Sequence, residues 1–253
     1  MKRVRGVMFD LDGVLYVRDR IVPGAREAIA RLRHAGVPMR FLTNTTRRPR
    51  RLIVQSLQRR GFDISTDEVL TPTSAVRERL QMTGQSPFLL IHPDLVEDFG
   101  ELPAGNDAVV LGDAGDEFRY ATLNQAFRLL IDGAPLYALA ANRYFQDDDG
   151  LSLDAGAFVT ALEFASGVRA ELFGKPAPAF FRAGLDGLGC GAEDAIMVGD
   201  DVEADVNGAK AIGIEGLLVR TGKYRPQDDG RLASGCLVVA DVAEAVERIL
   251  AGH

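Results

Sequence analysis

The chain has 253 residues, of which 47% are hydrophobic and 26% are charged, and this balance is typical of a folded globular protein. Its formal net charge of −7 argues against a nucleic-acid-binding protein that relies on a broad basic surface. No apolar run reaches the roughly 18 to 20 residues that cross a bilayer, and the N-terminal segment lacks a signal-peptide core, so we expect a cytoplasmic protein without nucleic-acid or membrane partners.

Apolar runs and segments of helical period alternate along the chain. The first run, residues 4–10, predicts a strand, and the helical pattern that follows it ends at Gly36. A second strand is predicted over 37–43, and Pro49 suits the first turn of a helix that ends before Gly61. This order of strand, helix, strand and helix predicts an α/β fold built on a parallel sheet.

The rest of the chain continues the same alternation. A closing helix is predicted over 242–250, because its apolar residues fall on one helical face. No long linker rich in Pro, Gly or Ser divides the chain, so any second domain must be an insertion. Further strands are predicted at 88–91, 108–111, 136–140, 195–198, 216–219 and 237–239.

The first predicted strand runs into a segment that places two carboxylates, Asp10 and Asp12, on alternate residues before Gly13. Open parallel sheets bind ligands beyond the carboxyl ends of their strands, so both side chains should stand at the rim of a crevice. Burying two such charges is costly unless a cation or a proton offsets their repulsion, and Mg²⁺ suits carboxylate and phosphate oxygens. A simple turn explains the same residues, whereas an EF-hand calcium loop would need further oxygen ligands that are missing.

Two more motifs carry groups that can bind phosphate. Thr43 ends the second predicted strand and Asn44 follows it, and at this place a hydroxyl and backbone N–H groups can hold an anion, although helix capping explains these residues equally well. Lys175 follows a glycine and precedes Pro176, a proline that can open a helix. Most lysines are solvated, but one held in such a turn could neutralise a phosphoryl oxygen and pair with Asp10.

A third strand end bears acids. The strand predicted over 195–198 leads into Asp200 and Asp201, and Asp205 lies one helical turn after Asp201. Helix capping and first-turn acids give an ordinary explanation for one or two of these residues. Capping does not explain why a further predicted strand also ends in acidic residues, as the strand before Asp10 does. The motif therefore indicates one site that these strand ends share.

In this order, the motifs Asp-x-Asp-Gly, Thr-Asn, Gly-Lys-Pro and Gly-Asp-Asp-x-x-x-Asp resemble those of the haloacid dehalogenase-like phosphatase superfamily. The resemblance extends over nearly the whole chain. Segments 150–158, 161–165 and 220–226 are similar to the subgroup that contains phospholysine phosphohistidine inorganic pyrophosphate phosphatase.

The resemblance implies a Rossmann-like parallel-sheet core with an inserted smaller α/β cap domain of the C2 type. We accordingly predict core residues 1–75 and 173–253 around a cap of residues 76–172. Within the cap, the predicted loop 142–150 could meet substrate through Arg143 and Tyr144. Its acids Asp147 to Asp149 could favour a cationic leaving group, although a solvated turn explains them more simply.

The resemblance also implies roles for the acids. Asp10 would be the nucleophile, and Asp12 would be the general acid that protonates the leaving group and then activates water. A Mg²⁺ cofactor would be held by the carboxylates of Asp10 and Asp200 and by the backbone carbonyl of Asp12.

By the same resemblance, Thr43, the backbone near Asn44, and Lys175 would bind the phosphoryl oxygens. Asp201 and Asp205 would orient water, Lys175 or metal-bound groups.

The sequence thus predicts a Mg²⁺-dependent phosphatase of small phosphorylated substrates: phosphomonoesters, with pyrophosphate or phosphoramidates as further candidates. The alternatives are a phosphotransferase or dehalogenase that uses the same aspartyl intermediate, and a catalytically silent protein that binds a phosphorylated metabolite. The sequence leaves the physiological substrate and the oligomeric state open, a homodimer included.

Overall fold

The computed structural model describes residues 4–147 and 150–252, which divide into two compact units. The first unit takes in the chain up to Thr43, the segment Arg51–Leu70 and the chain from Lys175 on. The second unit comprises Asn44–Arg50 and Thr71–Gly174 and is therefore inserted into the first. The α/β core with an inserted α/β cap is confirmed, and the domain limits at residues 75 and 172 stay a prediction.

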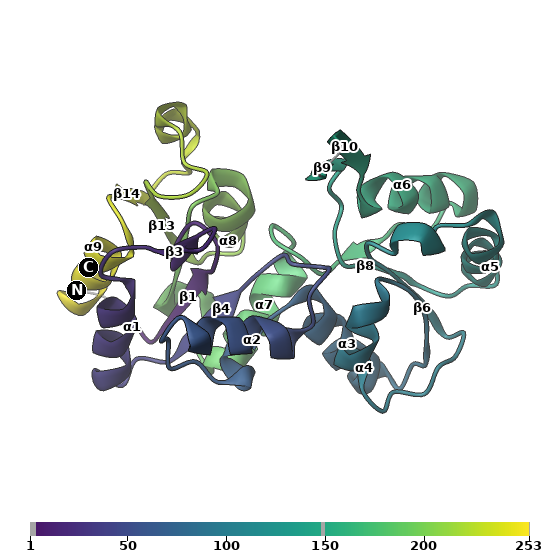
Figure 1. Ribbon diagram of the computed structural model, residues 1–253, viewed down its shortest axis with the longest axis horizontal. Helices are drawn as coiled ribbons and strands as arrows, with labels where there is room; N and C mark the ends of the chain where they lie inside the picture. The colour runs from purple at the N-terminus through teal and green to yellow at the C-terminus, as the bar shows by residue number, and fades with distance from the viewer. Residues whose placement is uncertain (1–3, 148–149, 253) are drawn as a thin grey trace. The chain divides into compact units, whose positions relative to one another are not determined.

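The first unit is built on six parallel strands in the order β14-β13-β12-β1-β4-β5 (Figure 1). Strand β1 lies between β4 and β12. The strands β4 and β5, which precede the insertion in the sequence, lie on one side of β1, and the strands that follow the insertion lie on the other side. Ligands of open α/β sheets bind at such a switch point. The strands are β1 (Gly6–Asp10), β4 (Met39–Leu42), β5 (Val69–Leu70), β12 (Ala195–Gly199), β13 (Glu215–Val219) and β14 (Leu237–Val239).

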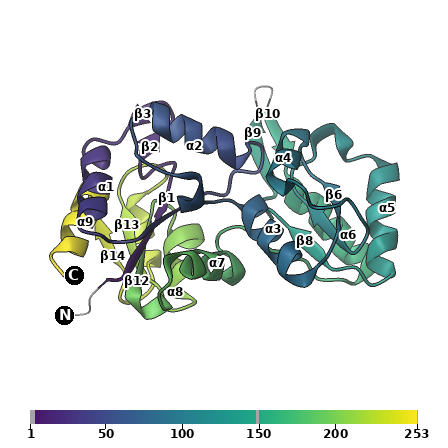
Figure 2. The same cartoon turned by 90° about the horizontal axis from the view of Figure 1, so that it is seen from below.

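Helices cover both faces of this sheet (Figure 2). They are α1 (Ala25–His34), α2 (Arg50–Arg59), α7 (Pro178–Leu188), α8 (Gly208–Lys210) and α9 (Val242–Leu250). A two-stranded hairpin of β2 (Tyr16–Val17) and β3 (Arg20–Ile21) follows β1. Short 3₁₀ helices of the chain lie at Thr66–Glu68, Pro93–Leu95, Gly115–Glu117, Ala192–Asp194 and Pro226–Arg231.

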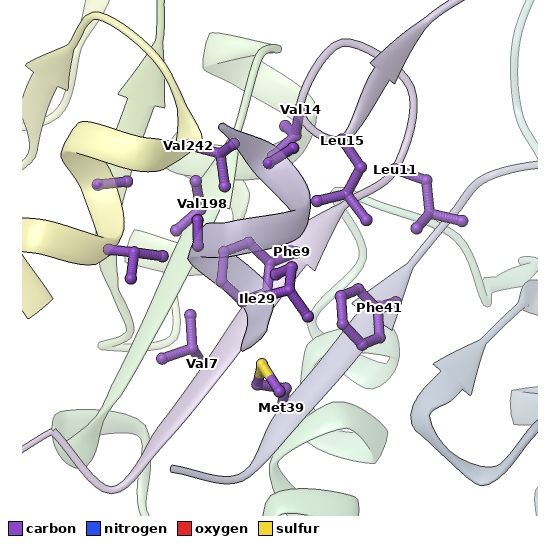
Figure 3. Packing of buried hydrophobic residues seen from close by; sticks show 14 of the residues in the cluster. Val7, Phe9, Leu11, Val14, Leu15, Ile29, Met39, Phe41, Val198 and Val242 are labelled. Atoms are coloured by element: carbon purple, nitrogen blue, oxygen red, sulfur yellow. The ribbon is translucent and has the colours of Figure 1, made fainter. Parts of the chain in front are cut away.

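The alternation of side chains along β1 explains why both faces are covered. Phe9 points into the core shared with α1 and α9, where Ile29 and Val242 lie (Figure 3), and its ring stacks on Phe41 at 5.7 Å between centroids. Met8 points to the opposite face and packs against α7. Strand β1 is therefore buried on both faces, as expected of a central parallel strand.

The second unit has its own sheet of four parallel strands in the order β11-β8-β7-β6. Its hydrophobic core joins Val109 and Leu111 of β7 to apolar residues of α5 and α6. Asp154 caps α6 by accepting a hydrogen bond from the next amide at 2.6 Å. The elements are α3 (Pro72–Thr83), β6 (Pro87–Leu90), α4 (Val96–Phe99), β7 (Ala108–Leu111), α5 (Tyr120–Ile131), β8 (Leu136–Ala138), α6 (Ala155–Ser166) and β11 (Glu171–Leu172).

The predicted loop 142–150 is wrong in part, because the chain forms an antiparallel hairpin of β9 (Tyr144–Asp147) and β10 (Gly150–Leu153). Residues within the predicted loop pair as strands instead, from Gly150 opposite Asp147 to Leu153 opposite Tyr144. Arg143 and Tyr144 are exposed, and the acids at 148 and 149 lie outside the described residues. None of the helices in the described ranges has the length and hydrophobicity that a bilayer crossing demands.

Candidate active site

Two neighbouring strands of the first unit deliver acids to the same place. Asp10 is the last residue of β1 and Asp200 directly follows β12, and the register of these strands pairs Phe9 with Val198. Both aspartates are buried. The carboxylates of Asp10, Asp200 and Asp205 each place an oxygen within 4.8 Å of the others. The first and fourth motifs therefore converge at the switch point of the sheet.

The turn after β12 separates the roles of two acids. Asp201 caps a π-helical turn, Val202–Asn207, by accepting hydrogen bonds from the amides of Glu203 at 3.1 Å and Ala204 at 3.0 Å. Asp205 points inward, is fully buried, and accepts a hydrogen bond from the Asp201 amide at 3.2 Å. The ordinary capping explanation is confirmed for Asp201, whereas Asp205 is part of the carboxylate cluster.

Lys175 provides the positive charge of this cluster. Its Nζ lies 2.5 Å from Asp10 Oδ1 and 2.7 Å from Asp205 Oδ1, and its side chain is 4% exposed. Burial on its own would lower the pKa of the Lys175 ammonium, but the charges of Asp10 and Asp205 raise that pKa above its usual range. The ammonium therefore stays charged.

The sequence-based expectation that Pro176 opens a helix is wrong. Helix α7 begins at Pro178, and the residue before it, Ala177, occupies the capping position with an extended backbone. Gly174 to Ala177 instead form the connection that carries Lys175 into the core.

Lys175 pairs with Asp10 and Asp205, while Asp200 adds a third carboxylate, so the cluster is short of positive charge. Burial, and then the charge of Asp10, raise the pKa of Asp200 to about 7. Burial likewise raises the pKa of Asp205, against the effect of Lys175. Asp200 Oδ1 is buried and has no hydrogen-bond partner among the described residues.

These residues fit a divalent cation. A buried carboxylate oxygen without a donor is costly, and a bound cation satisfies it. The donors are all oxygens, which suits hard cations such as Mg²⁺ rather than metals that prefer sulfur or imidazole. Asp10, Asp200 and Asp205 lie near enough to one another to hold the ion, and of the three only Asp200 is not paired with Lys175 among the described residues.

Thr43 and Asn44 fall in different units. Thr43 is buried directly after β4, one residue beyond the Leu42 that pairs with Asp10, so it lies next to the end of β1. Asn44 belongs to the second unit, where its side chain lies beside Gly174. Helix capping does not explain the pair, because α2 begins only at Arg50.

The Asp12 side chain is exposed and is not a member of the carboxylate cluster. An exposed carboxyl beside a buried one is suited to exchange protons with a substrate or with water. The predicted metal ligand at this position is the backbone carbonyl of Asp12, and this assignment stays a prediction.

Sequence reasoning missed a turn that contacts Asp200. After β13, the Lys223 amide donates a hydrogen bond to Asp200 Oδ2 at 2.7 Å, and the Thr221 hydroxyl donates one to the Gly13 carbonyl. The segment follows a predicted strand of the same sheet, so the strand-end argument that identified Asp10 and Asp200 could have identified it. The sequence of this turn, Thr-Gly-Lys, contains no carboxylate or other typical metal-binding side chain, so it does not by itself indicate a site.

Comparisons with known proteins cover both parts of the chain. Residues 7–102 match a family described as haloacid dehalogenase-like hydrolase, and residues 172–245 match one described as HAD-hydrolase-like. These two matches include all four motifs.

Individual relatives match along almost the full length. Haloacid dehalogenase-like hydrolase domain-containing protein 2 of Homo sapiens is 45% identical over 232 residues, which cover 91% of this chain and 90% of that protein. Phospholysine phosphohistidine inorganic pyrophosphate phosphatase of Rattus norvegicus is 42% identical over 257 residues, 98% of this chain and 94% of that protein. The solved structure of a p-nitrophenyl phosphatase from Archaeoglobus fulgidus matches with a TM-score of 0.87 and 25% identity, over 97% of this chain and 99% of that one.

Proposed function

Since the chain belongs to the haloacid dehalogenase-like hydrolase family and is a phosphatase of that family, we propose that it is a Mg²⁺-dependent enzyme that hydrolyses small phosphorylated substrates through an aspartyl-phosphate. The observation that carries this proposal is the buried cluster of Asp10, Lys175 and Asp200. Phosphoryl transfer from an anionic substrate needs a nucleophile and positive charge to offset the repulsion. Asp10 would supply the nucleophile, Lys175 supplies a fixed charge, and the unpartnered oxygen of Asp200 could bind a cation.

Phosphomonoesters are the proposed substrates, and the names of relatives that act on pyrophosphate, phospholysine and phosphohistidine add those bonds as candidates. A pocket of about 260 Å³ adjoins Asp200 and is lined in part by Lys223, Arg225 and Arg231. Lys223 pairs with Asp201 at 3.6 Å. Among the described residues, the Arg225 guanidinium has no carboxylate partner and could meet a negatively charged group. The same lining also holds Asp200, Asp201, Glu203 and Asp228, so the pocket as a whole carries no excess of positive charge.

In the first step, a carboxylate oxygen of Asp10 forms a bond to phosphorus while the bond from phosphorus to the leaving-group oxygen or nitrogen breaks. Asp12 gives its proton to that leaving atom. Lys175 and the Thr43 hydroxyl stabilise the phosphoryl oxygens as their charge shifts. Asp10 and Asp200 would hold Mg²⁺, whose positive charge would offset the repulsion between the carboxylate of Asp10 and the anionic substrate.

In the second step, water attacks phosphorus, and Asp12 takes a proton from that water. The bond between Asp10 and phosphorus breaks, which releases inorganic phosphate and restores both carboxyl groups to their starting states. Asp205 holds Lys175 throughout, since their ion pair is fully buried.

Removal of the cation should abolish activity. We expect chelation with EDTA to reduce hydrolysis of 4-nitrophenyl phosphate to background, because Asp10 would have to approach phosphate without charge compensation. Added Mg²⁺ should restore the rate. EDTA saturated with Mg²⁺ is the control for effects of the chelator itself. Unchanged turnover after exhaustive chelation would refute the proposed cofactor.

Replacing Asp12 with asparagine should affect substrates unequally. An alkyl phosphate needs protonation of its leaving group more than 4-nitrophenyl phosphate does, so we expect kcat/KM for the alkyl ester to fall about 10- to 100-fold further. The first bond-breaking step controls kcat/KM, which is why this parameter is measured. Asp19→Asn, at an exposed carboxyl on the nearby β2–β3 hairpin, is the matched control. Equal losses for both esters would argue against a general-acid role.

A further inference from the structure

The turn Thr221–Lys223 and the glycine after Asp12 enclose one oxygen of Asp200. Gly13 and Gly222 both have left-handed backbones, with φ of 91° and 65°. A Cβ on either glycine would overlap Asp200 Oδ2. The Lys223 amide donates to the same oxygen at 2.7 Å, and the hydrogen bond from the Thr221 hydroxyl to the Gly13 carbonyl ties the two loops together. Asp200 Oδ2 is thus held by backbone on several sides.

The other oxygen of Asp200 is in the opposite situation. Asp200 Oδ1 is buried, has no hydrogen-bond partner among the described residues, and belongs to a carboxylate that adjoins Asp10. A rotation that offered both oxygens to an ion would remove Oδ2 from the Lys223 amide. The enclosed oxygen therefore restricts Asp200 to a single-oxygen contact with any ion in the cluster.

We propose that the Thr221–Lys223 turn is a positioning element that limits Asp200 to one-oxygen coordination and thereby makes the site select Mg²⁺ over Ca²⁺. The inference rests on the proposed function, because it assumes that the cation binds at Asp10 and Asp200. Mg²⁺ binds six oxygens in a strict octahedron and is usually held by one or two carboxylates with water. Ca²⁺ takes six to eight oxygens and often binds a carboxylate through both of them, which the turn prevents at Asp200.

The test compares Thr221→Val with Thr221→Ser in the full chain. Valine keeps the shape of threonine but loses the hydroxyl that binds Gly13, whereas serine keeps the hydroxyl. Isothermal titration calorimetry with MgCl₂ or CaCl₂ alone gives both dissociation constants without any turnover. We expect Thr221→Val to weaken Mg²⁺ binding about 10-fold, with little change for Ca²⁺, since residues that orient metal ligands contribute about 10- to 100-fold to affinity. Thr221→Ser should retain the wild-type preference.

A second pair of variants isolates the steric part. Gly222→Ala places a methyl group against Asp200 Oδ2, whereas Gly189→Ala imposes a similar backbone cost, at φ 67°, where a Cβ would meet nothing within 4 Å. We expect only Gly222→Ala to lower the preference for Mg²⁺ over Ca²⁺, by at least about 10-fold. If Gly222→Ala does not fold, the Mg²⁺ and Ca²⁺ dissociation constants of Thr221→Val alone test the inference.

Unchanged preference in a folded Thr221→Val protein, or equal loss of both cations, would overturn this inference while the proposed function stands. A wild-type protein that binds no Mg²⁺ would overturn both.

Discussion

Replacing Asp10 with asparagine is expected to lower kcat for 4-nitrophenyl phosphate by at least about 1,000-fold, equivalent to about 4 kcal/mol of transition-state stabilisation. Asparagine has the size of aspartate but cannot attack phosphorus as an anion, so no aspartyl-phosphate would form. The fold should survive, because β1 is fixed by its paired strands and by the apolar side chains on both of its faces.

The control for this substitution is Asp186→Asn, which changes an exposed carboxyl on α7. Both proteins should unfold cooperatively in urea, so that a loss of turnover cannot be attributed to a loss of structure. Substantial phosphatase activity in Asp10→Asn, after contaminating enzymes are removed, would exclude Asp10 as the nucleophile.

Lys175→Met is expected to damage both stability and catalysis. Removing one partner of a buried ion pair leaves Asp10 and Asp205 without their ammonium, which typically destabilises a protein by about 3–5 kcal/mol. Turnover should fall at least about 100-fold, since one electrostatic contact with the transition state is lost. Urea unfolding in metal-free buffer and steady-state kinetics with Mg²⁺ measure the two effects.

Two further variants separate charge from packing. Lys210→Met removes a lysine at the end of α8 that forms no ion pair among the described residues, and it should have little effect. The double variant Lys175→Met with Asp205→Asn should regain part of the stability but none of the turnover, because it removes one unpaired carboxylate. A single Lys175→Met variant as stable and as active as the wild type would contradict the account of this cluster.

The sequence was informative where long apolar strands end in polar residues. Strands β1 and β12 are buried on both faces, so their hydrophobic runs were unmistakable, and the acids that follow them had to meet at one edge of the sheet. The closing helix α9 was equally clear from its apolar stripe. The α/β core with its inserted α/β cap followed from the same patterns together with the family resemblance.

Other features depend on contacts that no local pattern encodes. Strands β5 and β11 have two residues each, too few for a periodic signal, and are defined by their neighbours in the sheet. The inward position of Asp205 depends on a π-helical turn and on Lys175, which is 30 residues earlier in the chain. The enclosure of Asp200 by Gly13 and Gly222 joins loops from opposite ends of the sequence.

The most direct measurement is to trap the phosphorylated enzyme. The wild-type protein would be mixed with Mg²⁺ and a phosphorylated substrate, quenched in acid within its first turnovers, digested and analysed by mass spectrometry. We predict a phosphoryl group on the peptide that contains Asp10, and none on that peptide in Asp10→Asn. A phosphoryl group on a different residue, or rapid hydrolysis with no phosphorylated enzyme at any quench time, would contradict the account.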